Sequence, residues 1–232
     1  GTNNTLLGLR AGDAITTGGE STIIGKDAGS AMVDQKLTAV GYQAGQNSTA
    51  NQNNFFGYTA GKGNTSGQDN IAIGYAAYDT ADTEDHNLAI GNAAMGGAVA
   101  GGEYNIAIGN NALDALTSAD FCTAVGYQAG SAINSGGYNT LMGHQAGLGM
   151  TSGNTNTAVG AGAMQTNTVG DRNTAVGSGA LQTFNPSSNT DNNNTAVGYG
   201  ALNELTTGVN NIAIGGLALG GAVTTESNNL AI

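Results

Sequence analysis

The stretch Asn194-Thr195-Ala196-Val197-Gly198-Tyr199-Gly200-Ala201-Leu202 contains the phrase that decides the fold, because its first five residues return along the whole chain. The phrase reads Asn70-Ile71-Ala72-Ile73-Gly74 in one copy and Asn105-Ile106-Ala107-Ile108-Gly109 in another. Its glycine occurs thirteen times, at intervals of 16 to 18 residues apart from one interval of 21, and residues 229–232 begin a fourteenth copy. The sequence is therefore an array of repeats of about 17 residues.

Each position of the repeat, counted from the motif glycine as position 0, has its own residue type. Position −4 is Asn in eleven of fourteen copies, position −3 is Thr in eight, position −2 is Ala in ten, and position +3 is Ala in every complete copy. Position −1 is apolar throughout, so we expect it to face the core. Side chains alternate along a strand, so the small residue at −2 should face the other way, toward another backbone.

Three columns of the repeat are expected to be structural. Identical Asn side chains stacked from one coil to the next can form a hydrogen-bonded ladder, and Gly can supply tight bends. The positions that we single out are Asn70, Asn105, Asn156 and Asn194 for the ladder, Gly74, Gly109, Gly160 and Gly198 for the bends, and Ala77, Ala112, Ala163 and Ala201 for close packing.

The length of the unit predicts an all-β fold. Seventeen residues hold one short strand, a glycine bend and a polar turn, which is too little for a strand plus a helix and is typical of one coil of a parallel β-roll or β-solenoid. We expect residues 1–232 to form a single repeat array from a longer chain, because the last copy stops one residue before its glycine. Residues 182–193, which contain the only Pro, should form a loop inserted into one coil.

Composition excludes several classes of protein. The 40 glycines lack the three-residue period and the prolines of collagen, and a single Cys rules out a disulfide scaffold. Charged residues make up 9% and hydrophobic ones 39%, so the chain should fold. A net charge of −11 argues against nucleic acid and anionic membrane surfaces as partners. No apolar run approaches the roughly 20 residues that cross a bilayer, so we expect no membrane insertion.

One coil buries too little apolar surface to offset the entropy of ordering it. We therefore expect an obligate oligomer in which the Ala-lined faces pack against another chain. Position +4 divides the array, because it is Gly in some repeats and bulky in others, such as Tyr78, Met95 and Leu113. The three consecutive repeats with Tyr78, Met95 and Leu113 should have a thicker, better-filled cross-section than the repeats with Gly at this position.

With Thr123-Ala124-Val125-Gly126-Tyr127-Gln128-Ala129-Gly130 beside the phrase at residues 194–202, the chain resembles repeat regions of bacteriophage tail-fibre proteins. It is also similar to the head repeats of trimeric autotransporter adhesins, although those coils are shorter. The resemblance implies a left-handed parallel β-roll in a homotrimer, which is an extracellular fibre shaft or adhesive head. It implies attachment to a glycan or protein receptor on a host cell surface.

The stock of chemically active residues is small, and we predict no catalytic or cofactor-binding residue. The Tyr residues at position +1 form a discontinuous stripe that can either pack on itself or contact a sugar ring; they are Tyr42, Tyr58, Tyr75, Tyr127 and Tyr199. The weak candidates for calcium ligands are Asp79, Asp82, Glu84 and Asp85, for which a solvated turn is the favoured interpretation. Cys122, in the Asn column, should be a buried filler, and His144 a surface substitution in the Tyr column.

These observations favour a structural and adhesive segment of a phage tail fibre, not an enzyme. The alternative is the head of a bacterial surface adhesin, and the domains that flank the array would distinguish the two. A third interpretation is an ice-binding or polysaccharide-acting solenoid. Ice binding needs an unbroken Thr array, whereas the Thr column is interrupted at Ile71, Leu88, Ile106 and Ile212.

Overall fold

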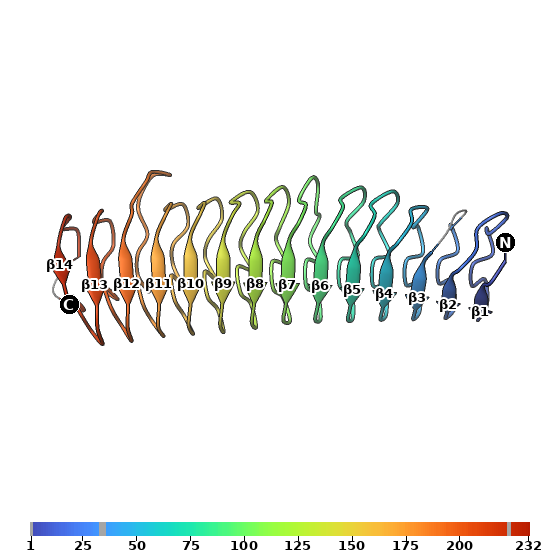
Figure 1. Ribbon diagram of the computed structural model, residues 1–232, viewed down its shortest axis with the longest axis horizontal. Coiled ribbons are helices and arrows are strands. Elements are labelled where there is room, and N and C mark those ends of the chain that lie inside the picture. The colour runs from blue at the N-terminus through green and yellow to red at the C-terminus, as the bar shows by residue number, and fades with distance from the viewer. Residues whose placement is uncertain (1, 33–35, 222–223) are drawn as a thin grey trace. The chain divides into compact units, whose positions relative to one another are not determined.

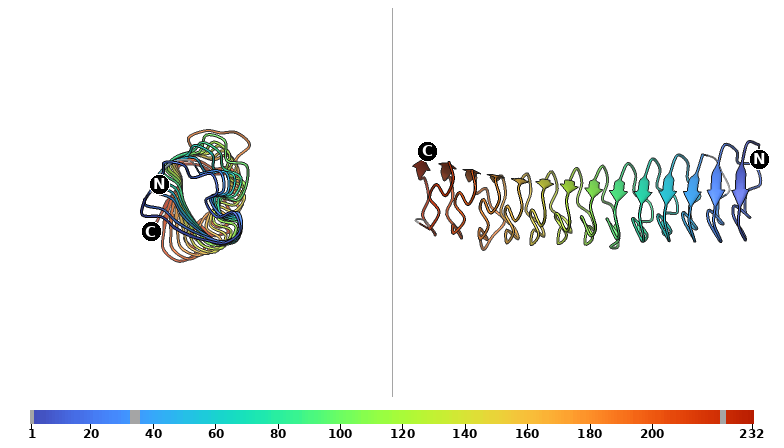
Figure 2. Two further views of the ribbon diagram at one scale, coloured as in Figure 1. Left: turned by 90° about the vertical axis from the view of Figure 1, so that its right-hand side faces the viewer. Right: turned by 90° about the horizontal axis from the view of Figure 1, so that it is seen from below.

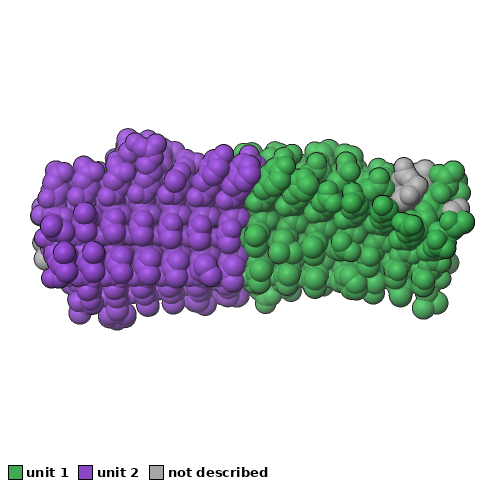
Figure 3. Space-filling model, viewed as in Figure 1, with its two compact units in different colours: residues 1–118 green, residues 119–232 purple. Residues whose placement is uncertain are grey.

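A computed structural model describes residues 2–32, 36–221 and 224–232. The chain divides into two compact units, residues 1–118 and residues 119–232. Figure 3 colours the two units and shows that, within each, side chains of successive coils line up in rows. The described residues contain strands, turns and bends and no helix, so none of them forms a helix that could cross a membrane.

The first unit is a parallel β-solenoid in which each coil contributes one strand of three residues (Figure 1). Successive strands lie side by side in the order of the sequence. They are β1 (Thr5–Leu7), β2 (Thr22–Ile24), β3 (Thr38–Val40), β4 (Asn54–Phe56), β5 (Ile71–Ile73), β6 (Leu88–Ile90) and β7 (Ile106–Ile108).

The second unit repeats the same architecture. Its strands are β8 (Thr123–Val125), β9 (Thr140–Met142), β10 (Thr157–Val159), β11 (Thr174–Val176), β12 (Thr195–Val197), β13 (Ile212–Ile214) and β14 (Leu230–Ala231). The prediction of an all-β parallel solenoid with coils of about 17 residues is confirmed. Figure 2 shows from two further directions that each coil within a unit follows the outline of the one before.

The strands pair so that equal positions of the repeat are neighbours. Thr157 pairs with Thr174 and Val159 with Val176. The coil of 21 residues keeps this register, because Thr174 still pairs with Thr195. Its extra residues are accommodated between β11 and β12, where residues 187–191 are exposed. The inserted segment therefore leaves the sheet unchanged.

The strand side chains point the opposite way from the prediction. Ala72 and Ala196, at position −2, are fully buried, whereas Ile73 and Ile214 are 41% exposed. The expectation that position −1 faces the core is therefore wrong. The interior of one coil is narrow, so the strand wall can place only a small side chain inside wherever the opposite wall supplies a large one.

The alanines at position +3 fill the same interior from the opposite wall. The four that we singled out, Ala77, Ala112, Ala163 and Ala201, are all fully buried. Both alanine columns thus lie within the chain's own coil. The expectation that Ala-lined faces pack against another chain is wrong, because no such face reaches the surface in these coils.

The interior is filled from whichever wall carries the large side chain. Leu141 at position −2 faces Gly147, and a Cβ on Gly147 would lie 2.9 Å from its Cδ2 atom. The reverse arrangement pairs Ala175 with Leu181, and both are fully buried. Every bulky residue at position +4 stands in a repeat with Ala at −2. In those repeats the two positions exchange volume, whereas the coils with Ala39 and Gly45 or with Ala124 and Gly130 carry a small residue at both.

The motif glycines form a column in which the backbones of successive coils touch. Gly74 has φ of 142°, and a Cβ there would overlap the carbonyl oxygen of Gly91. Gly198 has φ of 133° and a Cβ would overlap the carbonyl oxygen of Gly215. Only Gly combines such a φ with the missing side chain, which accounts for its presence at this position in every complete repeat.

Candidate functional site

The asparagine column is a buried ladder that joins neighbouring coils. In the first unit the Oδ1 atom of Asn70 accepts the backbone N–H of Asn87, whose own Oδ1 accepts that of Asn105, each at 2.9 Å. In the second unit Asn156 and Asn173 act in the same way toward Asn173 and Asn194, at 2.9 and 3.1 Å. These side chains are therefore used in holding coils together and are not available to a ligand.

The tyrosines at position +1 mostly cover one another. The rings of Tyr42 and Tyr58 stack at 5.0 Å, and those of Tyr58 and Tyr75 at 5.1 Å. Tyr127 stacks on His144 at 5.5 Å, so His144 continues the column as an aromatic ring. Stacking of this kind uses ring faces that a planar or sugar ligand would need.

Tyr199 differs from the other four. Its neighbours at position +1 are Ser178 in the preceding coil and Gly216 in the following one, neither of which has a ring. Its side chain is 68% exposed. Neither face of the Tyr199 ring therefore has an aromatic neighbour in its column, whereas each of the other four tyrosines stacks on at least one ring.

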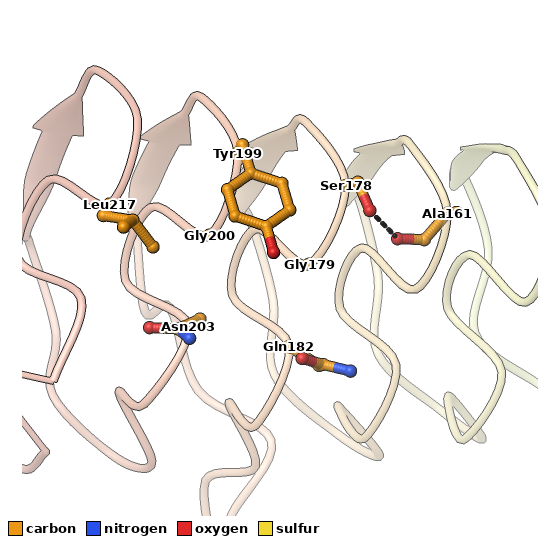
Figure 4. A pocket seen from close by; sticks show the side chains of 8 residues that line it. All are labelled: Ala161, Ser178, Gly179, Gln182, Tyr199, Gly200, Asn203 and Leu217. Atoms are coloured by element: carbon orange, nitrogen blue, oxygen red, sulfur yellow. Dashed lines mark hydrogen bonds between the residues drawn. The ribbon is translucent and has the colours of Figure 1, made fainter.

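A shallow open trough of about 270 Å³ lies beside this ring in the second unit. It is lined by Ala161, Ser178, Gly179, Gln182, Tyr199, Gly200, Asn203 and Leu217. Figure 4 shows Tyr199 between Ser178 and Leu217, with Gln182 and Asn203 on successive coils at the lower edge. The trough exists because position +2, which carries Gln128 and Gln145 in earlier coils, is Gly179 and Gly200 here.

A ladder of glutamine side chains ends at this trough. The Nε2 atom of Gln145 donates to Oε1 of Gln128 at 2.9 Å, that of Gln165 to Gln145 at 3.0 Å, and that of Gln182 to Gln165 at 3.1 Å. Asn203 follows in the next coil, but its side chain is one methylene shorter. Among the described residues, no side chain donates to Oε1 of Gln182, so the last amide of the ladder offers an acceptor at the trough.

Asn203 completes the polar edge of the trough. Its Oδ1 atom is buried and has no hydrogen-bond partner among the described residues. The lining contains a phenol, a serine hydroxyl and two amides, and none of its eight residues is Asp, Glu, His, Lys or Arg. The arrangement can hold a neutral polyhydroxylated ligand by stacking and hydrogen bonds.

The acidic residues considered for calcium are used in other ways. Glu84 is 3% exposed, and its carboxylate accepts the backbone N–H groups of Asp82, Thr83 and Gly101 at 2.8 to 3.0 Å. Asp85 accepts the N–H of Gln68 at 2.6 Å. No group of three or more His, Cys, Asp or Glu side chains with metal-site geometry occurs among the described residues. Glu84 and Asp85 thus hold backbone N–H groups of this turn and of neighbouring coils, and the four carboxylates, Asp79, Asp82, Glu84 and Asp85, do not converge on one point.

Two buried titratable groups also have structural surroundings. Burial raises the pKa of the Cys122 thiol. Its Sγ donates to the carbonyl of Gly136 at 3.2 Å, and in the next coil the Nδ2 group of Asn139 makes the equivalent bond to Gly153. Burial likewise raises the pKa of Tyr78, whose hydroxyl donates to the carbonyl of Glu84 at 3.1 Å. Both groups stay protonated at neutral pH, so neither is a nucleophile.

A second aromatic column, at position −5 of the repeat, was not predicted from the sequence. Position −5 places His86 on Tyr104 at 4.8 Å in the first unit and Phe121 on Tyr138 at 5.0 Å in the second. The signal was present as four rings at intervals of 17 or 18 residues. The trough residues Gln182 and Asn203 were also missed; glycine at position +2 in three successive repeats, Gly162, Gly179 and Gly200, is the pattern that indicates a trough.

Comparisons with protein-family models and with curated protein sequences give no match to this chain.

Proposed function

We propose that this chain is a structural and adhesive segment of an extracellular fibre, in which three copies lie side by side. The observation that carries the proposal is the outer face of the strands. Positions −3 and −1 hold only Thr, Asn, Phe, Met and aliphatic residues in all fourteen copies. In one chain alone this uncharged face is open to solvent.

The exposure of the face is substantial for apolar side chains. Ile71 and Ile73 are 38% and 41% exposed in the first unit, and Ile212 and Ile214 are each 41% exposed in the second. A row of exposed large apolar side chains on successive coils is unusual on a monomer and typical of an interaction surface. We assign it to other copies of the same chain.

Charge supports a second copy as the occupant. Each chain carries a net charge of −11, so copies repel one another wherever their acidic residues meet. A face without a single charged residue is the part of the surface on which like-charged copies can approach at least electrostatic cost. Thr hydroxyls at position −3 can still hydrogen-bond across such a contact.

The role of the assembly follows from its repetitive construction and from the resemblance to phage tail-fibre repeats. A solenoid spaces identical side chains by about 4.8 Å per coil, which suits a fibre shaft that presents ligand-contacting residues to a host cell surface. The head of a bacterial surface adhesin is the alternative, supported by the similar repeat phrase. Both roles place the chain outside the cell and give it no catalytic task.

Pull-down between copies tests the assembly directly. Tagged and untagged chains co-expressed in one cell should co-purify, and Ile214→Lys should abolish co-purification because it puts charge into the strand face. Ala115→Lys, at an exposed position away from the strands, is the matched control and should leave it intact. Failure of the unaltered chains to co-purify would contradict the proposal, as would equal effects of the two lysines.

A further inference from the structure

We propose that the trough around Tyr199 binds one neutral hexopyranose unit of a surface glycan. This inference deepens the proposed attachment role by naming the ligand class and its place on the chain. A sugar ring has an apolar face of C–H groups and a rim of hydroxyls. The trough offers an uncovered aromatic ring at Tyr199 and a polar edge at Gln182 and Asn203.

The floor of the trough supports a flat ligand. Gly179 and Gly200 have φ of 67° and 60°, in the same left-handed region as Gln128 and Gln145 at 54° and 57°. The backbone is therefore the same in both places, and what changes is the loss of the side chain. At Gly179 the missing side chain leaves room beside Tyr199, where a Cβ would meet only Oε1 of Gln182 at 3.6 Å. At Gly200 the Leu217 side chain lies against the backbone, 2.7 Å from where a Cβ would stand, and forms one side of the trough.

The polar edge supplies both kinds of hydrogen bond. The Nε2 group of Gln182 donates to Oε1 of Gln165, and the Oε1 atom of Gln182 can accept a hydrogen bond from a sugar hydroxyl. The Nδ2 group of Asn203 makes no hydrogen bond that the described residues show and can donate. Ser178 adds a hydroxyl, which donates to the carbonyl of Ala161 at 3.2 Å and can accept from a ligand.

The lack of charge selects the class of sugar. None of the eight lining residues carries a charge, and the chain as a whole is strongly negative. Acidic sugars such as sialic or uronic acids would meet repulsion without a compensating cation. A neutral hexopyranose avoids this repulsion.

Saturation-transfer NMR titration with methyl α- and β-glycosides of glucose, galactose and mannose tests the inference. At least one glycoside should bind, and Tyr199→Ala should weaken its affinity by about tenfold through loss of the stacking face. Gly179→Gln should weaken binding to a similar extent, because the new side chain would fill part of the trough. The backbone can accept glutamine here, since Gln128 and Gln145 have similar φ angles at the same position of the repeat. Tyr138→Ala, which removes another exposed tyrosine of the same unit, should leave the affinity unchanged.

Two results would overturn the inference. One is that none of the six glycosides binds up to its solubility limit; the other is that Tyr138→Ala weakens binding as much as Tyr199→Ala does. Circular dichroism melts of each variant show whether the fold is retained. The assembly is judged separately, since a monomer that binds sugar contradicts the trimer alone and a trimer that binds none contradicts this site alone.

Discussion

The Oδ1 atom of Asn156 accepts the backbone N–H of Asn173, seventeen residues later in the chain, at 2.9 Å. The same side chain donates through Nδ2 to the carbonyl of Gly170 at 2.8 Å. One amide thus satisfies a donor and an acceptor of the following coil, in a place that water does not reach. Repetition of this contact along each unit makes the asparagine column the polar spine of the solenoid.

Asn156→Ala should therefore lower the free energy of unfolding by about 1 to 3 kcal/mol, because the buried N–H of Asn173 loses its acceptor. The carbonyl of Gly170 keeps the Nδ2 group of Asn167 as a donor at 3.1 Å. Urea denaturation followed by circular dichroism measures the change. Asn47→Ala, at an exposed asparagine, is the matched control and should stay within about 0.5 kcal/mol of the parent. Equal stabilities of the two variants would refute a supporting role for the ladder.

The motif glycines should tolerate no side chain. Gly198→Ala is expected to cost more than about 2 kcal/mol, because its Cβ would overlap the carbonyl oxygen of Gly215 at a φ of 133°. Gly216→Ala should be nearly neutral, since a Cβ at Gly216 would meet no atom within 4 Å. Thermal melts of the two variants compare the same substitution in both surroundings, and a harmless Gly198→Ala would show that the coils are not in backbone contact.

The exchange of volume between positions −2 and +4 predicts a rescue. Leu141→Ala alone should cost about 2 to 5 kcal/mol by opening a cavity, and Gly147→Leu alone about 1 to 3 kcal/mol by overpacking. The double variant recreates the arrangement of Ala175 and Leu181, so it should be more stable than Leu141→Ala. A double-mutant cycle by chemical denaturation gives the coupling, and strictly additive losses would contradict the proposed complementarity.

Burial raises the pKa of Asp79 above its ordinary value of 3.8. The folded chain thus holds this proton more tightly than the unfolded chain, and the ionised carboxylate opposes folding once the pH exceeds the raised pKa. Asp79→Asn should therefore raise the melting temperature at pH 7, and the difference should disappear below about pH 3.8, where the carboxyl is protonated in both states. A variant that melts lower at pH 7 would show that the ionised Asp79 is stabilising.

The repeat phrase was enough to predict the parallel solenoid and the length of its coil. Register followed as well, because Asn, Thr, Ala and Gly can each keep one environment only if equal positions stack. The direction of the strand side chains did not follow. Hydrophobicity alone predicts that Ile73 is buried and Ala72 is not. The narrow interior of a coil instead selects the side chain of smaller volume, and the width of the coil cannot be read from the repeat phrase.

The candidate site was predictable only in part. Tyr199 belongs to a column that is aromatic in several repeats. It differs from Tyr58 because the adjacent coils carry Ser178 and Gly216 at the same position and so have no ring to stack on it. The end of the glutamine ladder at Gln182, beside Asn203, depends on how far each side chain reaches across coils. Such contacts join residues 17 or 20 positions apart, and spacing alone does not show which amide stays unpaired.

Sedimentation equilibrium of the unaltered chain tests the central claim, that copies associate through their uncharged strand face. At 0.15 M salt the account predicts a single species with three times the 22.8 kDa mass of one chain, unchanged on dilution. A stable species of 22.8 kDa that keeps its strand signal in circular dichroism would contradict it.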